Sequence, residues 1–219
     1  MEDFVPFLPL NPTVEAFLAI AFAQFMALIS PGPDFAMVIK NSVTRSRKTG
    51  FYTAMGLASG AFVHSAYCVL GLGALITAFP LALTVIKGVG ACYLFYLGAR
   101  AIAARVKPAH IEGGHKQSDL SFKEAYAQGI STTLLNPNAI IYYVTLISAL
   151  VTEGASIPFQ WFCVFWFGGM ATCWFSFVAF CLTTRRAQKS FGKYAHWVER
   201  STGIVLVLIA ILLIYQIWT

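Results

Sequence analysis

The sequence has few charged residues. Asp, Glu, Lys and Arg make up 11% of its 219 residues, whereas 58% of the residues are hydrophobic. Soluble domains are about 25% charged, so this composition excludes a soluble protein. A helix needs about 20 residues to cross a bilayer, which leaves room for roughly six spans and short loops. We therefore expect one all-α integral membrane domain over residues 1–219.

The sequence also lacks the spacings that metal, thiol and hydrolytic chemistry require. Its five cysteines form no Cys-x-x-Cys pair, and its four histidines are scattered. Metal sites need clustered ligands. Ser30, His64 and Asp34 could be written as a catalytic triad, but no nucleophile elbow surrounds them. We expect no enzyme activity, no metal and no cofactor.

Basic residues are missing from the N-terminus and from alternate loops. Residues 1–12 contain no Lys or Arg, so no cleaved signal peptide is expected. The net charge of +6 comes from loops near residues 40–48, 100–123 and 185–200, whereas the loops near Pro80 and Glu153 have almost no cationic charge. Because positive loops stay cytoplasmic, both termini are predicted to be periplasmic, and the charge is explained without nucleic acid.

Hydrophobicity predicts six spans. They cover about residues 13–41, 50–78, 81–104, 124–152, 157–184 and 197–218. The first contains Ser30-Pro31-Gly32-Pro33-Asp34, which cannot continue a regular helix, since proline lacks an N–H and clashes with the preceding turn. A broken helix in hydrocarbon is tolerated only where protein or a water-filled cavity pairs the freed backbone groups, and an acid such as Asp34 is costly there.

The fourth span is interrupted in the same way, by Asn136-Pro137-Asn138. Ser30-Pro31 and Asn136-Pro137 each place a capping residue before proline, which suits the start of a new helix. Three spans on either side of a linker predict two inverted three-helix repeats: repeat one at about 1–106, a cytoplasmic linker at about 107–121, and repeat two at about 122–219.

If the two breaks meet, they can form a site for a zwitterion. The N-terminus of a resumed helix attracts a carboxylate, and Asp34 can bind an ammonium group. Asp34 could instead only stabilise its own helix start. These considerations favour an amino acid as the substrate.

Further polar residues near the breaks could have either a functional or a structural role. The predicted substrate-binding residues are Ser30, Pro31, Gly32, Pro33, Asp34, Asn136, Pro137, Asn138, Tyr142 and, more weakly, Gln24. Ser131, Thr132, Thr133 and Tyr143 could also bind substrate, or could pair freed backbone groups. His64 could relay protons together with Asp34, since histidine titrates near neutral pH, or could be a hydrogen-bonded interior side chain. Gly56-x-x-x-Gly60 predicts close helix packing.

Several of these motifs resemble the LysE/RhtB family of bacterial amino-acid exporters. The likeness is carried by Ser30–Phe35, Ser46-Arg47-Lys48 with Gly50, Lys87-x-x-Gly90-x-x-Tyr93-Leu94, and Asn136-Pro137-x-Ala139. Within the family the chain looks most like the threonine and homoserine efflux branch. The resemblance implies proton-driven export of a small neutral amino acid across the bacterial inner membrane.

The expected partners are the amino-acid substrate, protons and the lipid bilayer, with a homodimer as one option for assembly. Many relatives have lysine where this chain has Asn138, so export of a basic or another neutral amino acid is one alternative. A thiol electron carrier of the DsbD/CcdA kind, which has a similar six-span plan, is another. That chemistry needs a cysteine at each break, where this chain has Ser30 and Asn136.

Overall fold

The computed structural model describes residues 12–78, 80–103, 117–150, 156–181 and 184–218. Helices account for nearly all of these residues, and no strand occurs among them. The helices are α1 (Pro12–Ile29), α2 (Pro33–Thr44), α3 (Arg47–Ala78), α4 (Pro80–Ala103), α5 (Phe122–Leu134), α6 (Pro137–Leu150), α7 (Ile157–Cys181) and α8 (Arg185–Trp218). The all-α prediction is confirmed for this part of the chain.

Four helices, α3, α4, α7 and α8, are long and apolar enough to cross a membrane. Two further candidates are bent pairs: α1 and α2 meet at an angle of 46°, and α5 and α6 at 63°. Both bends lie where the sequence analysis placed its proline breaks. Among the described residues there are thus four candidate spans, or up to six if each bent pair is counted as one.

The last helix is longer than predicted. The sixth span was expected to begin near Trp197, but α8 begins at Arg185. Its first turns contain Arg, Lys, Gln and Ala, which are good helix formers, although the charged and amide side chains among them are too polar for hydrocarbon. The hydrophobic stretch within α8 starts at Lys193, so hydropathy located the membrane segment and missed its helical extension.

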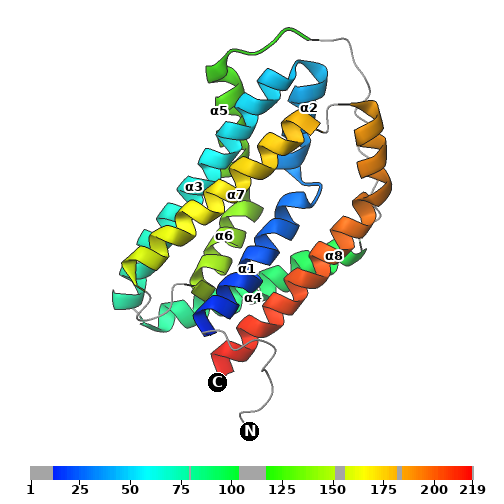
Figure 1. The fold of residues 1–219 in the computed structure, drawn as a ribbon. Coiled ribbons are helices and arrows are strands. Elements are labelled where there is room, and N and C mark those ends of the chain that lie inside the picture. The colour runs from blue at the N-terminus through cyan, green and yellow to red at the C-terminus, as the bar shows by residue number, and fades with distance from the viewer. Residues whose placement is uncertain (1–11, 79, 104–116, 151–155, 182–183, 219) are drawn as a thin grey trace.

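The long helices pair across the molecule. Helix α3 runs beside α7, and α4 lies against α8; the start of α1 and the end of α8 are at the same end of the fold (Figure 1). Helix α3 also packs closely on α5. A Cβ atom added at Gly56 would lie 2.1 Å from the carbonyl oxygen of Tyr126, so only glycine fits there. The close packing predicted from Gly56-x-x-x-Gly60 is confirmed.

The end of the predicted linker contacts the turn between α2 and α3. The N–H of Gln117 donates to the carbonyl of Thr44 (2.8 Å), and the Arg45 guanidinium donates to the carbonyl of Ser118. Ser121 and Glu124 then form a capping box at the start of α5, which satisfies N–H groups that would otherwise lack partners. Residues 107–116 of the linker and the N-terminal residues 1–11 lie outside the described part of the chain.

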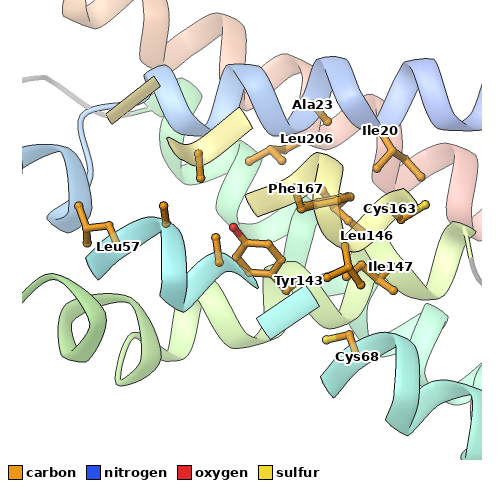
Figure 2. Packing of buried hydrophobic residues seen from close by; sticks show 14 of the residues in the cluster. Ile20, Ala23, Leu57, Cys68, Tyr143, Leu146, Ile147, Cys163, Phe167 and Leu206 are labelled. Atoms are coloured by element: carbon orange, nitrogen blue, oxygen red, sulfur yellow. The ribbon is translucent and has the colours of Figure 1, made fainter. Parts of the chain in front are cut away.

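The hydrophobic core draws on helices from both halves of the chain. Figure 2 shows Ala23, Leu57, Tyr143, Phe167 and Leu206, which come from α1, α3, α6, α7 and α8, gathered in one cluster. The rings of Tyr143 and Phe167 lie 5.7 Å apart. Tyr143 is buried in this core and also lines a cavity at the breaks, so the core fixes one wall of that cavity.

Candidate functional site

The first break places an uncapped helix start beside an acid. The N-cap of α2 is Gly32, with Pro33 following it at the start of the helix, and no side chain forms a cap hydrogen bond there. The prediction that Ser30 caps a helix starting at Pro31 is therefore wrong. The new helix begins at the second proline, Pro33, and Pro31 lies in the turn between α1 and α2. Asp34 occupies the first turn of α2.

The last carbonyl groups of α1, before this break, share hydrogen-bond donors. Pro31 has no N–H for the carbonyl of Ala27, so the N–H of Ser30 lies 3.2 Å from both the Met26 and the Ala27 carbonyl oxygens. The hydroxyl of Thr202, on α8, lies 2.9 Å from the Met26 oxygen. The same hydroxyl lies 2.8 Å from the Val198 carbonyl of its own helix, so its one hydrogen is shared between α8 and the break, 176 residues away.

The second break has the predicted cap. The side-chain oxygen of Asn136 accepts from the N–H of Asn138 (3.0 Å), and Pro137 is the first residue of α6. Pro137 leaves the carbonyl of Thr133 without its usual donor. His64 Nε2 lies 3.0 Å from that oxygen, and the N–H of Asn136 lies 3.2 Å from it.

The structure brings both breaks to one cavity of about 140 Å³. This volume far exceeds the roughly 10–15 Å³ that a single water needs, so it suits a small polar solute. The lining residues come from α1, the first break, α2, the second break, α6 and α7: Gln24, Ala27, Leu28, Ser30, Gly32, Pro33, Asp34, Phe35, Asn136, Ala139, Tyr142, Tyr143 and Phe175.

Three buried polar atoms at the cavity have no hydrogen-bond partner. They are Oε1 of Gln24, Oδ1 of Asp34 and the hydroxyl of Tyr142. Gln24 is 1% exposed, and its Nε2 donates to the carbonyl of Phe167 (2.9 Å). Since that carbonyl can only accept, the amide orientation is fixed and Oε1 is left as an acceptor. Buried polar groups normally have partners, so these three atoms make the cavity a candidate ligand site.

The other oxygen of Asp34 connects the cavity to the second break. Oδ2 of Asp34 accepts from the hydroxyl of Thr133 (3.1 Å), and the carbonyl of Thr133 faces His64 Nε2. Because a carbonyl cannot donate, Nε2 carries the hydrogen, and Nδ1 of a neutral ring accepts from the Tyr67 hydroxyl at 2.6 Å. His64 also stacks on Tyr143, with ring centroids 5.2 Å apart. Both ring nitrogens of His64 are thus paired.

Not all of the predicted site residues line the cavity. Gln24, Ser30, Gly32, Pro33, Asp34, Asn136 and Tyr142 do; Pro31, Pro137, Asn138 and His64 do not. The side-chain oxygen of Asn138 accepts from the hydroxyl of Tyr93, on α4, and so links α6 to α4. Pro31 and Pro137 bend the chain, and His64 is linked to Asp34 through Thr133.

Sequence reasoning gave too little weight to Thr133 and missed Phe175. The signal for Thr133 was its position four residues before Pro137, where a carbonyl loses its donor. Phe175 lies among many aromatic residues of α7, and no pattern in the sequence distinguishes it. Within the described residues no group of His, Cys, Asp and Glu side chains could hold a metal ion, and no cysteine lines the cavity.

Comparison with known proteins gives a family. The profile of the LysE type translocator family matches residues 25–217. The "Threonine efflux protein" of Escherichia coli (strain K12) is 28% identical over 85% of this chain and 91% of its own length, and that of Salmonella typhi is 27% identical over the same shares. An uncharacterised membrane protein of Bacillus subtilis is 27% identical over 89% of this chain and 96% of its own length. No solved structure matches. The match over most of its length shows that the chain belongs to the LysE type translocator family of membrane transporters.

Proposed function

We propose that this protein exports a small neutral amino acid, of the threonine or homoserine type, from the cytoplasm in exchange for protons. The observation that carries the proposal is the cavity at the two breaks, with unpaired oxygens on Gln24, Asp34 and Tyr142. These atoms offer acceptors for an ammonium group and a hydroxyl that can donate. The threonine efflux relatives favour the same substrate class.

The two ends of a zwitterion find opposite partners in this cavity. Oδ1 of Asp34 and Oε1 of Gln24 are the acceptors available to the α-ammonium group. The uncapped N-terminus of α2, beginning at Pro33, offers partial positive charge to the α-carboxylate. A helix start and a fixed carboxylate within one cavity therefore favour a molecule with both charges.

The remaining lining residues favour a neutral side chain. Apart from Asp34, the cavity is lined by no charged residue, so a second charge on the substrate would find no counter-ion. Tyr142 and Asn136 can instead form hydrogen bonds with a substrate hydroxyl. A basic amino acid would have to bury a second cation beside apolar residues such as Leu28 and Phe175, which is costly.

Asp34 is the group we propose to carry the proton. Loss of the ammonium group leaves a buried carboxylate facing an empty cavity, and a proton from the periplasm can replace the cation. His64, which sequence reasoning paired with Asp34 as a proton-coupling residue, has both ring nitrogens paired. That pairing supports a role as a fixed donor to the second break.

The order of helices supports two inverted repeats. A bent pair followed by two long helices occurs twice: α1–α2 with α3 and α4, and α5–α6 with α7 and α8. We propose that each bent pair is one span, which gives six spans with both termini periplasmic. Alternating access would then expose the cavity to each side in turn.

Inside-out membrane vesicles provide the test. With an acidic interior, vesicles containing the protein are expected to accumulate labelled threonine or homoserine, and an uncoupler should abolish this. Asp34→Asn should remove the accumulation, while Glu15→Gln, an acid at the start of α1 that does not line the cavity, serves as the control. Equal accumulation of lysine would overturn the assignment of a neutral substrate. Accumulation that survives the uncoupler would overturn proton coupling.

A further inference from the structure

Thr133 departs from the usual behaviour of hydroxyls in this fold. Serine and threonine in helices commonly donate to a carbonyl one turn earlier. The neighbouring Thr132 does so, to Gln128 at 2.6 Å, and Thr145 does so, to Ile141 at 2.7 Å. The hydroxyl of Thr133 instead crosses to α2 and donates to Oδ2 of Asp34 at 3.1 Å. The carboxylate has drawn this hydroxyl away from its own helix.

Thr133 is also the junction of three helices. It lies in the last turn of α5 and is 2% exposed. Its hydroxyl contacts α2, and its carbonyl is paired by His64 of α3 because Pro137 offers no N–H. A Cβ atom added at Gly60 of α3 would lie 2.7 Å from the Cβ of Thr133, so α3 fits tightly around this side chain. A change at Asp34 therefore reaches the second break directly through Thr133.

The bond between Thr133 and Asp34 depends on charge. A hydrogen bond to an ionised carboxylate is roughly twice as strong as a neutral one. The hydroxyl has an alternative acceptor, the carbonyl oxygen of Leu57 on α3, at 3.5 Å. When Asp34 takes up a proton, the charge assistance is lost and the two acceptors become comparable. The link between α2 and α5 is then weakened.

We propose that Thr133 is the positioning residue that transmits the charge of Asp34 to the second broken helix, holding α2 and α5 together while Asp34 is ionised and releasing them when it is protonated. This inference rests on the proposed proton-coupled export. It adds a physical path by which a proton bound at the first break alters the second, which is the coupling that an exchanger requires.

A test of pH dependence must distinguish the titration of Asp34 from that of other titratable groups near it. They are His64 and Tyr67 on α3, and Tyr142 and Tyr143 on α6. Among the cavity-lining residues there is no Lys or Arg. Asp34→Asn removes the titrating carboxyl, and His64→Gln removes the titrating ring while keeping an N–H donor for the Thr133 carbonyl. This pair of variants tells the two groups apart.

The transport test compares Thr133→Val, which keeps the shape and removes the hydroxyl, with Thr133→Ser, which keeps the hydroxyl. Thr132→Val, whose lost hydroxyl bonds only within α5, is the matched control. In proteoliposomes, Thr133→Val should retain threonine exchange without a gradient but lose proton-driven accumulation by at least about fivefold, the low end of typical coupling between sites. Thr133→Ser should restore it, and Thr132→Val should resemble the unmodified protein. An unchanged ratio of driven accumulation to exchange in Thr133→Val, or a failure of Thr133→Ser to restore it, would overturn the proposal.

A second measurement does not depend on the substrate. Hydrogen exchange of residues 129–136 in nanodiscs, corrected for intrinsic rates, should show protection that falls at acidic pH in the unmodified protein. Protection should be low at both pH values in Thr133→Val and independent of pH in Asp34→Asn, and His64→Gln should still respond. A response that disappears only in His64→Gln would overturn the assignment to Asp34. If the exchange pattern holds but no amino acid is transported, the proposed function fails while the coupling through Thr133 stands.

Discussion

The second break satisfies its own backbone, whereas the first leaves polar groups available to a ligand. At the second break Asn136 caps α6, and His64 pairs the carbonyl that Pro137 frees. At the first break α2 begins at Pro33, Gly32 before it supplies no side-chain cap, and Asp34 Oδ1 has no partner. Two interruptions that look alike in sequence therefore differ in structure: the first leaves an unpaired carboxylate oxygen at the cavity, and the second is held by its own cap and by His64.

The difference follows from the residues around each proline. Pro31 and Pro33 flank a glycine at the first break, so two N–H groups are missing within three residues, and Asp34 lies in the first turn of the new helix. The second break has a single proline preceded by asparagine, whose side chain is long enough to reach the N–H two residues later. An asparagine before a single proline thus gives a helix start with a side-chain cap. Two prolines around a glycine give a helix start without one.

The largest expected effect separates the two breaks by their role in binding. Replacing Asp34 with Asn should abolish proton-driven accumulation of threonine and should slow threonine exchange about 10- to 100-fold, since a hydrogen bond to a charged group contributes about 1.5–3 kcal/mol. Replacing Asn136 with Ser, which keeps a capping oxygen and adds no charge to the cavity, should slow exchange far less. Labelled uptake into inside-out vesicles measures both. Equal losses in the two variants would remove the distinction between the breaks.

A larger side chain on α3, placed against Thr133, tests whether the position of the second break affects stability and transport. Gly60→Ala would place a methyl group 2.7 Å from the Cβ of Thr133, and overpacking of this kind costs up to about 3 kcal/mol. We expect a lower melting temperature in detergent and slower transport. Gly71→Ala is the matched control on the same helix, since nothing lies within 4 Å of its added Cβ atom. If both variants melt alike, the contact between Gly60 and Thr133 does not constrain the fold.

His64 distinguishes a structural donor from a proton carrier at the second break. His64→Leu leaves the Thr133 carbonyl without its side-chain donor, which should lower the free energy of unfolding by about 2 kcal/mol. His64→Gln keeps an N–H group and should retain most of the stability and the proton-driven transport. Thermal unfolding and vesicle uptake report the two properties. Loss of driven transport in His64→Gln, with stability unchanged, would instead identify His64 as a proton carrier.

The smallest effect concerns the cap itself. Asn136→Ala removes the acceptor for the Asn138 N–H, and the loss of a helix cap costs about 1 kcal/mol. Ser30→Ala should leave stability nearly unchanged, because Gly32 and not Ser30 precedes α2. Melting temperatures of the two variants measured side by side would check the comparison. A larger loss for Ser30→Ala would contradict the difference in capping.

Much of the site could be read from the chain before any coordinates. The missing N–H groups of the prolines predicted both bends, and the high free energy of an acid inside the membrane singled out Asp34. The convergence of the breaks on one cavity also agrees with the expectation drawn from their matched positions. The same reasoning failed at Ser30, because a proline at the start of a helix is recognisable but a second proline two residues later shifts that start. It also placed Asn138 at the site; in the structure Asn138 accepts from Tyr93 and does not line the cavity.

The sequence by itself determined the membrane setting, the family resemblance and the two interruptions, since these depend on hydrophobic length and on the missing N–H of proline, which act locally. Tertiary structure decided which freed groups find partners. The donor to the Thr133 carbonyl is 69 residues away, and the acceptor for the Thr133 hydroxyl is 99 residues away. Such pairings depend on how separate helices are brought together in space, and no local pattern encodes them.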